Sequence, residues 1–295
     1  MSAAAGDDEQ LLLVNPSAGA GRSLELLGAA SAALDRNGVR FRTVMSESLR
    51  HGRELAREAA ARGETVIVMS GDGLIGQVGG ELAGSDSALA IIPGGRGNDL
   101  ARTLGIPPDP VAAAAVVAER RTRRLDVGRV GEEAFLGIAS CGFDSDANRI
   151  ANSSRLVRGR LVYSYAALRA LARWRPAGFE LRLDGEPVEM RGYSVAVANS
   201  RAYGGGMLIA PDAELDDGCF DVVLTADMSR LRFLANLPKV FGGTHVSNPR
   251  VSVRRAASVE IAADRPFGLY ADGDLVAELP ARVTIEPAAL SVIAP

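Results

Sequence analysis

The sequence predicts an α/β fold, in which an N-terminal parallel-sheet domain is followed by a C-terminal β-rich sandwich or barrel. Two observations lead to this prediction. Apolar runs of strand length alternate with helix-length segments in residues 11–119, which is the pattern of parallel strands joined by crossover helices. From residue 125 onward, short alternating strands follow one another closely. We therefore expect two domains, residues 1–124 and 125–295, and the last strand is a candidate to return to the first domain.

The first domain is expected to hold four strands, at residues 11–14, 39–45, 65–69 and 88–92. The third run, Thr-Val-Ile-Val-Met, is apolar on both faces, as buried parallel strands are. Helices are expected at residues 23–36, 50–62, 74–82 and 111–119, and Gly38 and Gly63 end the first two of them.

Glycine-rich or small polar turns follow three of these strands. Asn15 opens the first turn, Ser70-Gly71-Asp72-Gly73 forms the second, and the third runs from Pro93 to Asp99. The carboxyl ends of the strands are where open α/β sheets bind ligands, and glycines that precede a helix let backbone amides face a phosphate. Gly-Asp-Gly alone is equally well explained as an ordinary tight turn. Three such turns on one sheet edge favour a phosphate site.

The second region is expected to be mostly β, with strands at residues 124–130, 133–139, 179–183, 193–198, 221–225, 251–253, 258–262, 268–270 and 282–285. Asp184-Gly185 and Asp272-Gly273 indicate hairpin turns. Residues 156–174 are apolar at helical spacing instead; such a stripe usually faces a core, and a lipid-facing surface is the less common alternative. The arginines of residues 120–124 are consistent with a solvated linker face or with a phosphate or membrane patch.

Composition excludes several classes of protein. A net charge of −3 gives no reason to expect nucleic-acid binding. Two cysteines and two histidines provide neither a disulfide framework nor a zinc spacing, so Cys141 and Cys219 are expected to be small core residues. The first apolar run, residues 11–14, is too short for a signal or transmembrane segment, and we expect a cytoplasmic protein.

Taken together, these segments resemble the soluble diacylglycerol kinase family of bacteria, which is related to the sphingosine and ceramide kinases. The match covers nearly the whole chain, and its motifs stand in the family's order. They are Asn15-Pro16 with Gly19, Ser70-Gly71-Asp72-Gly73, the stretch Pro93 to Arg102, Leu125-Asp126-Val127-Gly128, Gly142-Phe143-Asp144, Gly204-Gly205-Gly206-Met207, Pro211-Asp212-Ala213, Leu215-Asp216-Asp217-Gly218 and Asp272-Gly273-Asp274. The resemblance implies a nucleotide domain similar to phosphofructokinase and NAD kinases, a β-rich lipid-substrate domain, and an active site between them.

The resemblance also implies roles for individual residues. The nucleotide-contacting positions correspond to Asn15, Ser46, Ser70, Gly71, Asp72, Gly73, Arg96 and Asn98. Asp72, Asp99 and Asp126 correspond to the acids of a magnesium–water network. Asp217, with backbone groups of Glu214 and Cys219, corresponds to a structural metal site. Asp274 corresponds to the catalytic proton acceptor and acts with Asp72. ATP and Mg²⁺ are the expected cofactors, since phosphoryl transfer needs positioning and charge neutralisation.

The leading hypothesis is therefore an ATP-dependent lipid kinase that meets diacylglycerol or a similar lipid peripherally at the membrane surface; a homodimer is left open. Four positions depart from the family pattern: Leu74 and Arg96 stand where Thr is usual, Gln77 and Asp274 where Glu is usual. They motivate the alternative of a catalytically impaired lipid-binding or regulatory homologue. A third reading, a soluble-substrate kinase similar to NAD kinases, is opposed by residues 215–218 and 272–274.

Overall fold

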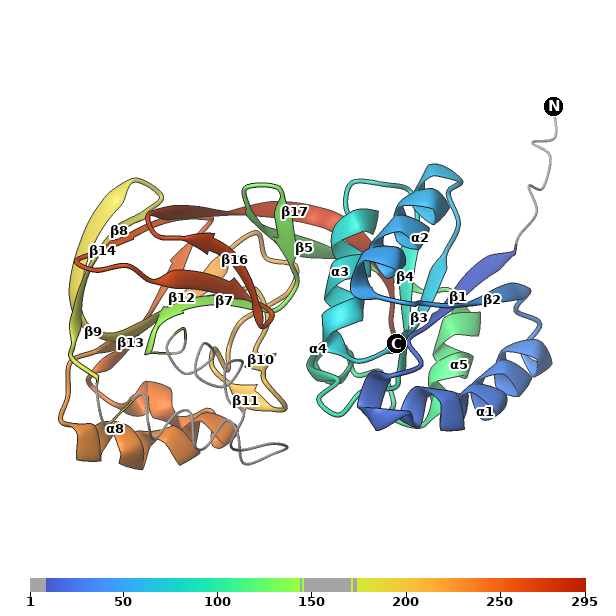
Figure 1. Ribbon diagram of the computed structural model, residues 1–295, viewed down its shortest axis with the longest axis horizontal. Coiled ribbons are helices and arrows are strands. Elements are labelled where there is room, and N and C mark those ends of the chain that lie inside the picture. Colours follow the sequence, from blue (N-terminus) through green and yellow to red (C-terminus); the bar gives the residue numbers. More distant parts are fainter. Residues whose placement is uncertain (1–8, 144, 146–170, 172–173) are drawn as a thin grey trace. The chain divides into compact units, whose positions relative to one another are not determined.

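The computed structural model describes residues 9–143, 145, 171 and 174–295 (Figure 1). The chain divides into two compact units. The first runs to Val127 and includes Glu286–Pro295, and the second is Gly128–Ile285. Two strands, β5 (Thr122–Val130) and β17 (Ala281–Ile293), contribute residues to both units.

The first unit is built on a parallel sheet. Its strands are β1 (Gln10–Val14), β2 (Phe41–Met45), β3 (Val66–Ser70), β4 (Ala88–Pro93) and the later part of β17, in the order β17-β4-β3-β1-β2. Every adjacent pair is parallel. All residues of β1 and β3 are buried, because helices cover both faces of the sheet.

Five α-helices surround this sheet: α1 (Arg22–Arg36), α2 (Leu49–Ala61), α3 (Asp72–Leu82), α4 (Asp99–Thr103) and α5 (Pro110–Glu119). Helix α1 packs against α5, and α2 packs against α3 on the other side of the strands (Figure 1). Ser48 and Asp109 cap α2 and α5 by accepting hydrogen bonds from the first turn, which fixes where these helices begin. The predicted strands and the four predicted helices of this unit are confirmed, with ends displaced by two residues at most.

The second unit is an antiparallel β structure. Its main strands are β7 (Ile138–Gly142), β8 (Ala177–Leu183), β9 (Glu186–Ala198), β12 (Phe220–Ala226), β13 (Val251–Ala256), β14 (Ser258–Ala263), β15 (Gly268–Ala271) and β16 (Asp274–Glu278). The order is β16-β15-β7-β9-β8-β14-β17, and β12 joins β9 to β13. Short strands β6 (Glu133–Phe135), β10 (Ala202–Tyr203) and β11 (Met207–Leu208) complete the described strands. The predicted β-rich domain is confirmed.

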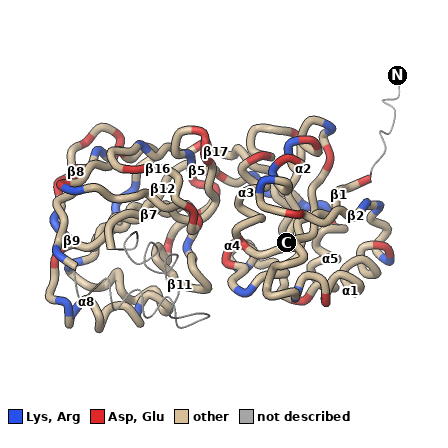
Figure 2. Tube along the Cα trace, viewed as in Figure 1, with Lys and Arg blue, Asp and Glu red and all other residues tan. Residues whose placement is uncertain are grey.

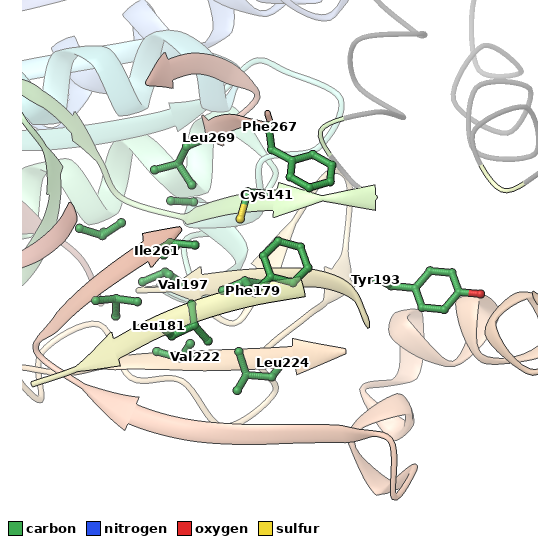
Figure 3. Packing of buried hydrophobic residues seen from close by; sticks show 14 of the residues in the cluster. Cys141, Phe179, Leu181, Tyr193, Val197, Val222, Leu224, Ile261, Phe267 and Leu269 are labelled. Atoms are coloured by element: carbon green, nitrogen blue, oxygen red, sulfur yellow. The ribbon is translucent and has the colours of Figure 1, made fainter. Parts of the chain in front are cut away.

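A large hydrophobic core lies in the second unit (Figure 3), and a smaller cluster around Ile138, Ala198 and Val223 lies beside it. Along β8 the residues alternate between buried and exposed, so that Phe179 and Leu181 point into this core. Tyr193 stacks on Phe233 with ring centroids 4.0 Å apart. Cys141 lies in the core as predicted, whereas Cys219 is only half-buried, so the core prediction is wrong for Cys219.

Several elements differ from the sequence prediction. The predicted strand 133–139 is interrupted at Leu136-Gly137, and β9 and β17 are far longer than expected. Helix α8 (Arg230–Asn236) and the 3-10 helices η2 (Leu237–Gly242) and η3 (Thr244–Ser247) were not predicted. Of the predicted helix 156–174, only Leu171 and Trp174 are among the described residues. No helix in the described part of the chain is long and apolar enough to cross a bilayer.

Candidate active site

The carboxyl ends of β1, β2, β3 and β4 lie at one edge of the parallel sheet. In the register, Val14 is opposite both Met45 and Met69, and Ser70 is opposite Pro93. The ladder continues one residue into three of the turns: the N–H of Asn15 donates to Met69 O at 3.1 Å, that of Ser46 to Val14 O at 2.8 Å, and that of Gly94 to Ser70 O at 2.8 Å. The predicted nucleotide positions at the strand ends therefore lie side by side.

Glycines allow the three turns to touch. A Cβ on Gly71 would lie 3.2 Å from the Cα of Gly95, and a Cβ on Gly95 would clash with the Gly71 backbone. A Cβ on Gly19 would lie 2.6 Å from Gly94 O, and Gly19 has a φ of +62°, which favours glycine. The turns after β1, β3 and β4 thus converge into one backbone surface, which was the sequence argument for a phosphate site.

Two carboxylates lie beside this surface. Asp72 is the first residue of α3, and Asp99 is the first residue of α4 and is buried. Asp72 Oδ1 accepts a hydrogen bond from the N–H of Leu100 at 3.3 Å, so it faces the start of α4. Burial raises the pKa of the Asp72 carboxyl, the charge of Asp99 raises it further, and the amides of residues 98–100 oppose the shift. Two close, desolvated carboxylates of this kind fit a hard divalent cation.

Arg102 holds the turn that follows β4. Its Nη1 lies 3.0 Å from Asp99 Oδ1, and its Nη2 donates to Gly97 O at 2.9 Å. Within the same turn, the Asn98 side chain both accepts from and donates to the backbone of Gly95, at 2.9 and 3.2 Å. Asn98 has a φ of 52°, so these bonds fix a left-handed conformation in a residue other than glycine. Arg96, in the same turn, is exposed.

The other predicted nucleotide residues support their own turns. Asn15 Oδ1 accepts from the N–H and the hydroxyl of Ser17, at 3.0 and 2.8 Å. Ser46 is buried, and its hydroxyl donates to Val14 O at 3.3 Å. Ser70 is buried at the end of β3. Their contacts with a nucleotide stay predictions.

Asp126, the third acid of the predicted magnesium network, is buried on β5. Its Oδ1 accepts a hydrogen bond from the N–H of Ala288 at 2.7 Å. The structure brings Asp72 and Asp99 together. Among the described residues, no three His, Cys, Asp or Glu side chains gather closely enough to form a metal site. The three-acid set stays a prediction.

Leu74 lies in the core between two helices. It is 2% exposed, and a Cβ on Gly52 of α2 would clash with its Cδ1 atom. The side chain at position 74 therefore fills a gap between α3 and α2, which explains an apolar residue at the point where the family has Thr.

Asp272 positions the hairpin that carries Asp274. Strands β15 and β16 are joined by the two-residue turn Asp272-Gly273, whose φ values of 49° and 97° are those of a type I′ turn. The Asp272 carboxylate accepts from the N–H groups of Leu136, Gly137 and Ile138 at 3.0 to 3.2 Å. Those bonds give the N–H groups at the interruption between β6 and β7 an acceptor. Asp274, the first residue of β16, is exposed.

The predicted structural metal site contains an arginine. Asp217 Oδ1 accepts from the N–H of Cys219 at 3.1 Å, and Asp217 Oδ2 pairs with Arg255 Nη2. Arg255 Nε also lies 3.9 Å from Asp221 Oδ1. Both carboxylate oxygens of Asp217 thus have partners within the chain. The ligand set Glu214, Asp217 and Cys219 stays a prediction.

Three supporting residues were missed by sequence reasoning. The spacing of Asp99 and Arg102 is the i, i+3 spacing of a helical ion pair and is a usable signal. Asp272 was interpreted only as a turn residue. Arg255 is 38 residues from Asp217, and no local pattern links the two.

Comparisons with known proteins match both units. A family model described as diacylglycerol kinase catalytic domain matches residues 9–130, and one described as YegS C-terminal NAD kinase beta sandwich-like domain matches residues 137–294. The chain is 38% identical over 291 residues to a diacylglycerol kinase of Mycobacterium tuberculosis, covering 96% of this chain and 94% of that protein. It is 29% identical to a diacylglycerol kinase of Bacillus subtilis over 76% of each chain. A crystal structure of a diacylglycerol kinase from Bacillus anthracis shares the fold, with a TM-score of 0.75 at 22% identity over 98% of this chain and 97% of that one.

Proposed function

This chain belongs to the family of diacylglycerol kinases and YegS-like lipid kinases, and we propose on that premise that it transfers the γ-phosphoryl group of ATP to the hydroxyl of diacylglycerol. It is a lipid kinase, and its family uses a nucleotide. The observation that supports the proposal most strongly is the convergence of three glycine turns beside Asp72 and the buried Asp99.

The residues of the first unit would position the phosphates. Gly71 and Gly95 let the turns after β3 and β4 come into contact, and the amide groups at the start of α3 would face a phosphate. Asp72 and Asp99 would hold the cation, since carboxylate oxygens are the ligands that Mg²⁺ prefers. Mg²⁺, when bound, would neutralise charge on the phosphates during transfer.

Asp274 is proposed as the base. The lipid hydroxyl oxygen would attack the γ-phosphorus while its proton passes to the Asp274 carboxylate, and ADP would leave. Asp274 is exposed on a hairpin that Asp272 holds with three hydrogen bonds. A short side chain on a fixed hairpin suits this role, because misplacement by about 1 Å can lower a rate by about 10²-fold.

A catalytically impaired, lipid-binding homologue is not favoured. Leu74, Gln77 and Arg96 were the reasons to consider it, and the structure gives Leu74 a packing role against Gly52. The exposed Arg96 is compatible with a phosphate contact at the same edge.

The experiment is a kinase assay with purified protein, γ-labelled ATP and detergent-dispersed diacylglycerol, in Mg²⁺, in Mn²⁺ and in EDTA. We expect labelled phosphatidic acid with either metal and none in EDTA. Asp274→Ala should lower kcat by about 10² to 10⁴-fold while ATP binding is retained. A wild-type protein that labels no lipid in a panel of alcohols under either metal would refute the proposal.

A further inference from the structure

We propose that helix α8 and the following 3-10 helix η2, residues Arg230–Gly242, form the surface by which the second unit docks on an anionic lipid bilayer. This inference rests on the proposed function, since it states how the enzyme reaches a substrate that resides in a membrane. We call this segment the α8–η2 surface.

The α8–η2 surface exposes large apolar side chains. Leu231 is 79% exposed and Phe241 60%, the two highest values among the large hydrophobic residues of the described chain, and Leu234 is 40% exposed. These three residues lie within eleven positions of one another. Single exposed leucines are normal on a soluble surface, but a group of this size marks an interaction site.

Helix α8 is held so that these side chains point outward. Phe233 and Asn236 are its buried residues, and Phe233 stacks on Tyr193 of the core. At 100° per residue, Leu231 lies almost opposite Phe233 and Asn236, and Leu234 lies on the flank. Ser229 caps the helix, and Arg230 Nη2 donates to Trp174 O at 2.8 Å. The apolar side chains thus project from a fixed element.

Charge identifies the partner as an anionic surface. The α8–η2 surface contains Arg230, Arg232 and Lys239, the only lysine of the chain, and no Asp or Glu. Since the whole chain carries −3, the remainder carries −6. Arg232 and Lys239 are exposed beside the apolar residues, and the tube along α8 is blue and tan, without red (Figure 2).

Apolar side chains flanked by cations suit the interface of a bilayer. Leucine and phenylalanine insert at the level of the acyl chains, while Arg and Lys contact anionic headgroups. Each cation near such a surface strengthens binding about fivefold. The α8–η2 surface has cations at both ends of its apolar group, so one orientation satisfies both kinds of contact.

The test is vesicle flotation of the full chain with two kinds of vesicle, pure phosphatidylcholine and phosphatidylcholine with phosphatidylglycerol. We expect wild type to bind the anionic vesicles and to be released by salt. The double variant Leu231→Ser, Phe241→Ser should bind about tenfold or more weakly, and Arg232→Gln, Lys239→Gln should lose most of its preference for anionic lipid.

Matched controls exist elsewhere on the chain. Leu24 and Leu49 are exposed as well, at 47% and 44%, so Leu24→Ser, Leu49→Ser should bind as wild type does. Arg36→Gln, Arg50→Gln serves the same purpose for charge. In a separate measurement, Phe241→Trp keeps an apolar side chain, and the emission of this tryptophan should shift to the blue with anionic vesicles only. The emission of the buried Trp174 should stay constant and serve as the background.

The outcomes separate this inference from the proposed function. All surface variants should phosphorylate detergent-dispersed diacylglycerol as wild type does, because the α8–η2 surface holds no residue of the proposed chemistry. Wild type that phosphorylates this lipid but does not bind anionic vesicles would overturn the docking surface alone. Serine variants that bind vesicles normally, or that instead dissociate a dimer in sedimentation, would also overturn it.

Discussion

Two acidic clusters, one in each unit, contain the same kinds of side chain in different arrangements. In the first unit, Asp72 and Asp99 lie together at the start of two helices, and their nearest cation, Arg102, pairs with Asp99. In the second unit, Asp217 and Asp221 share Arg255, which the chain supplies from β13. Each cluster therefore contains one arginine, but Asp72 accepts a backbone hydrogen bond from Leu100, whereas Arg255 reaches both aspartates of its cluster.

This difference teaches how to judge a predicted metal site. Burial raises the pKa of both Asp72 and Asp221, so burial alone does not distinguish the clusters. The contributions that lower the pKa do distinguish them. Backbone amides lower the pKa of Asp72, and the charge of Arg255 lowers the pKa of Asp221. Each cluster has two aspartates and one arginine, so the difference lies in the place of the positive charge: beside Asp99 in the first cluster, and between Asp217 and Asp221 in the second.

The largest expected effect is on catalysis by the first cluster. Asp72→Ala should lower kcat by about 10³-fold or more, because it removes a carboxylate proposed to hold the metal. It should also abolish the rise in Tm that we expect Mg²⁺ with ATP to cause in wild type, an increase in stability of about 2.7 kcal/mol at 100 times Kd.

Asp217→Ala is the matched control in the second cluster. Its kcat and its response to Mg²⁺ should stay within a factor of three of wild type. A loss of the response to Mg²⁺ with this variant as well would erase the distinction between the clusters.

The next effect concerns the glycine contact beside the first cluster. Gly95→Ala places a methyl group against the Gly71 backbone, so the two turns must separate. We expect kcat/KM to fall by about 10²-fold, since the phosphate-facing groups are displaced. Gly28→Ala, where nothing lies within 4 Å, should keep full activity and serves as the control. Equal activity of the two variants would contradict the proposed convergence.

A smaller effect is expected from the internal cation of the second cluster. Arg255→Met leaves Asp217 without its ionic partner and Asp221 without a nearby positive charge, and should lower the free energy of unfolding by about 1 to 3 kcal/mol in urea denaturation. Because the vacated cluster then resembles the first, added Mg²⁺ should recover part of the loss. An Arg255→Met variant that is as stable as wild type in EDTA would show that the ion pair is incidental.

The smallest effect is a gain in stability. The pKa of Asp72 is raised in the folded chain, so the folded state binds a proton more tightly, and stability falls as pH rises from the unfolded pKa through the folded one. Asp72→Asn cannot ionise and should be more stable than wild type by up to about 1 kcal/mol at pH 7 in EDTA. Thermal unfolding between pH 3.5 and 7 measures this, and the gain should vanish at the acidic end. A destabilised Asn variant at pH 7 would reverse the sign we assign.

The parts of the structure that follow from local patterns were predictable. The strands of the first unit are short apolar runs. Their glycines identify the turns at Ser70 to Gly73 and at Pro93 to Asp99. Leu74 shows the limit of local patterns. Its side chain packs against Gly52, and Gly52 lies on another helix. The Arg255 pair is likewise a product of the tertiary fold. Helix α8 was missed because Leu231 and Leu234 lie on its exposed side and Asn236 on its buried side, so its apolar residues do not follow one face.

The return of β17 to the first unit has a consequence for the order of events during translation. Ser291 and Val292 pair with Ala88 and Leu89 at the edge of β4, and Leu290 is fully buried. A ribosome therefore releases the whole second unit before it releases the strand that covers β4. Until then the first unit presents an unpaired apolar edge, which is a template for aggregation. Nascent chains stalled before residue 286 should therefore be protease-sensitive in the first unit. Every residue of the candidate phosphate-binding turns in that unit has already been made at this point.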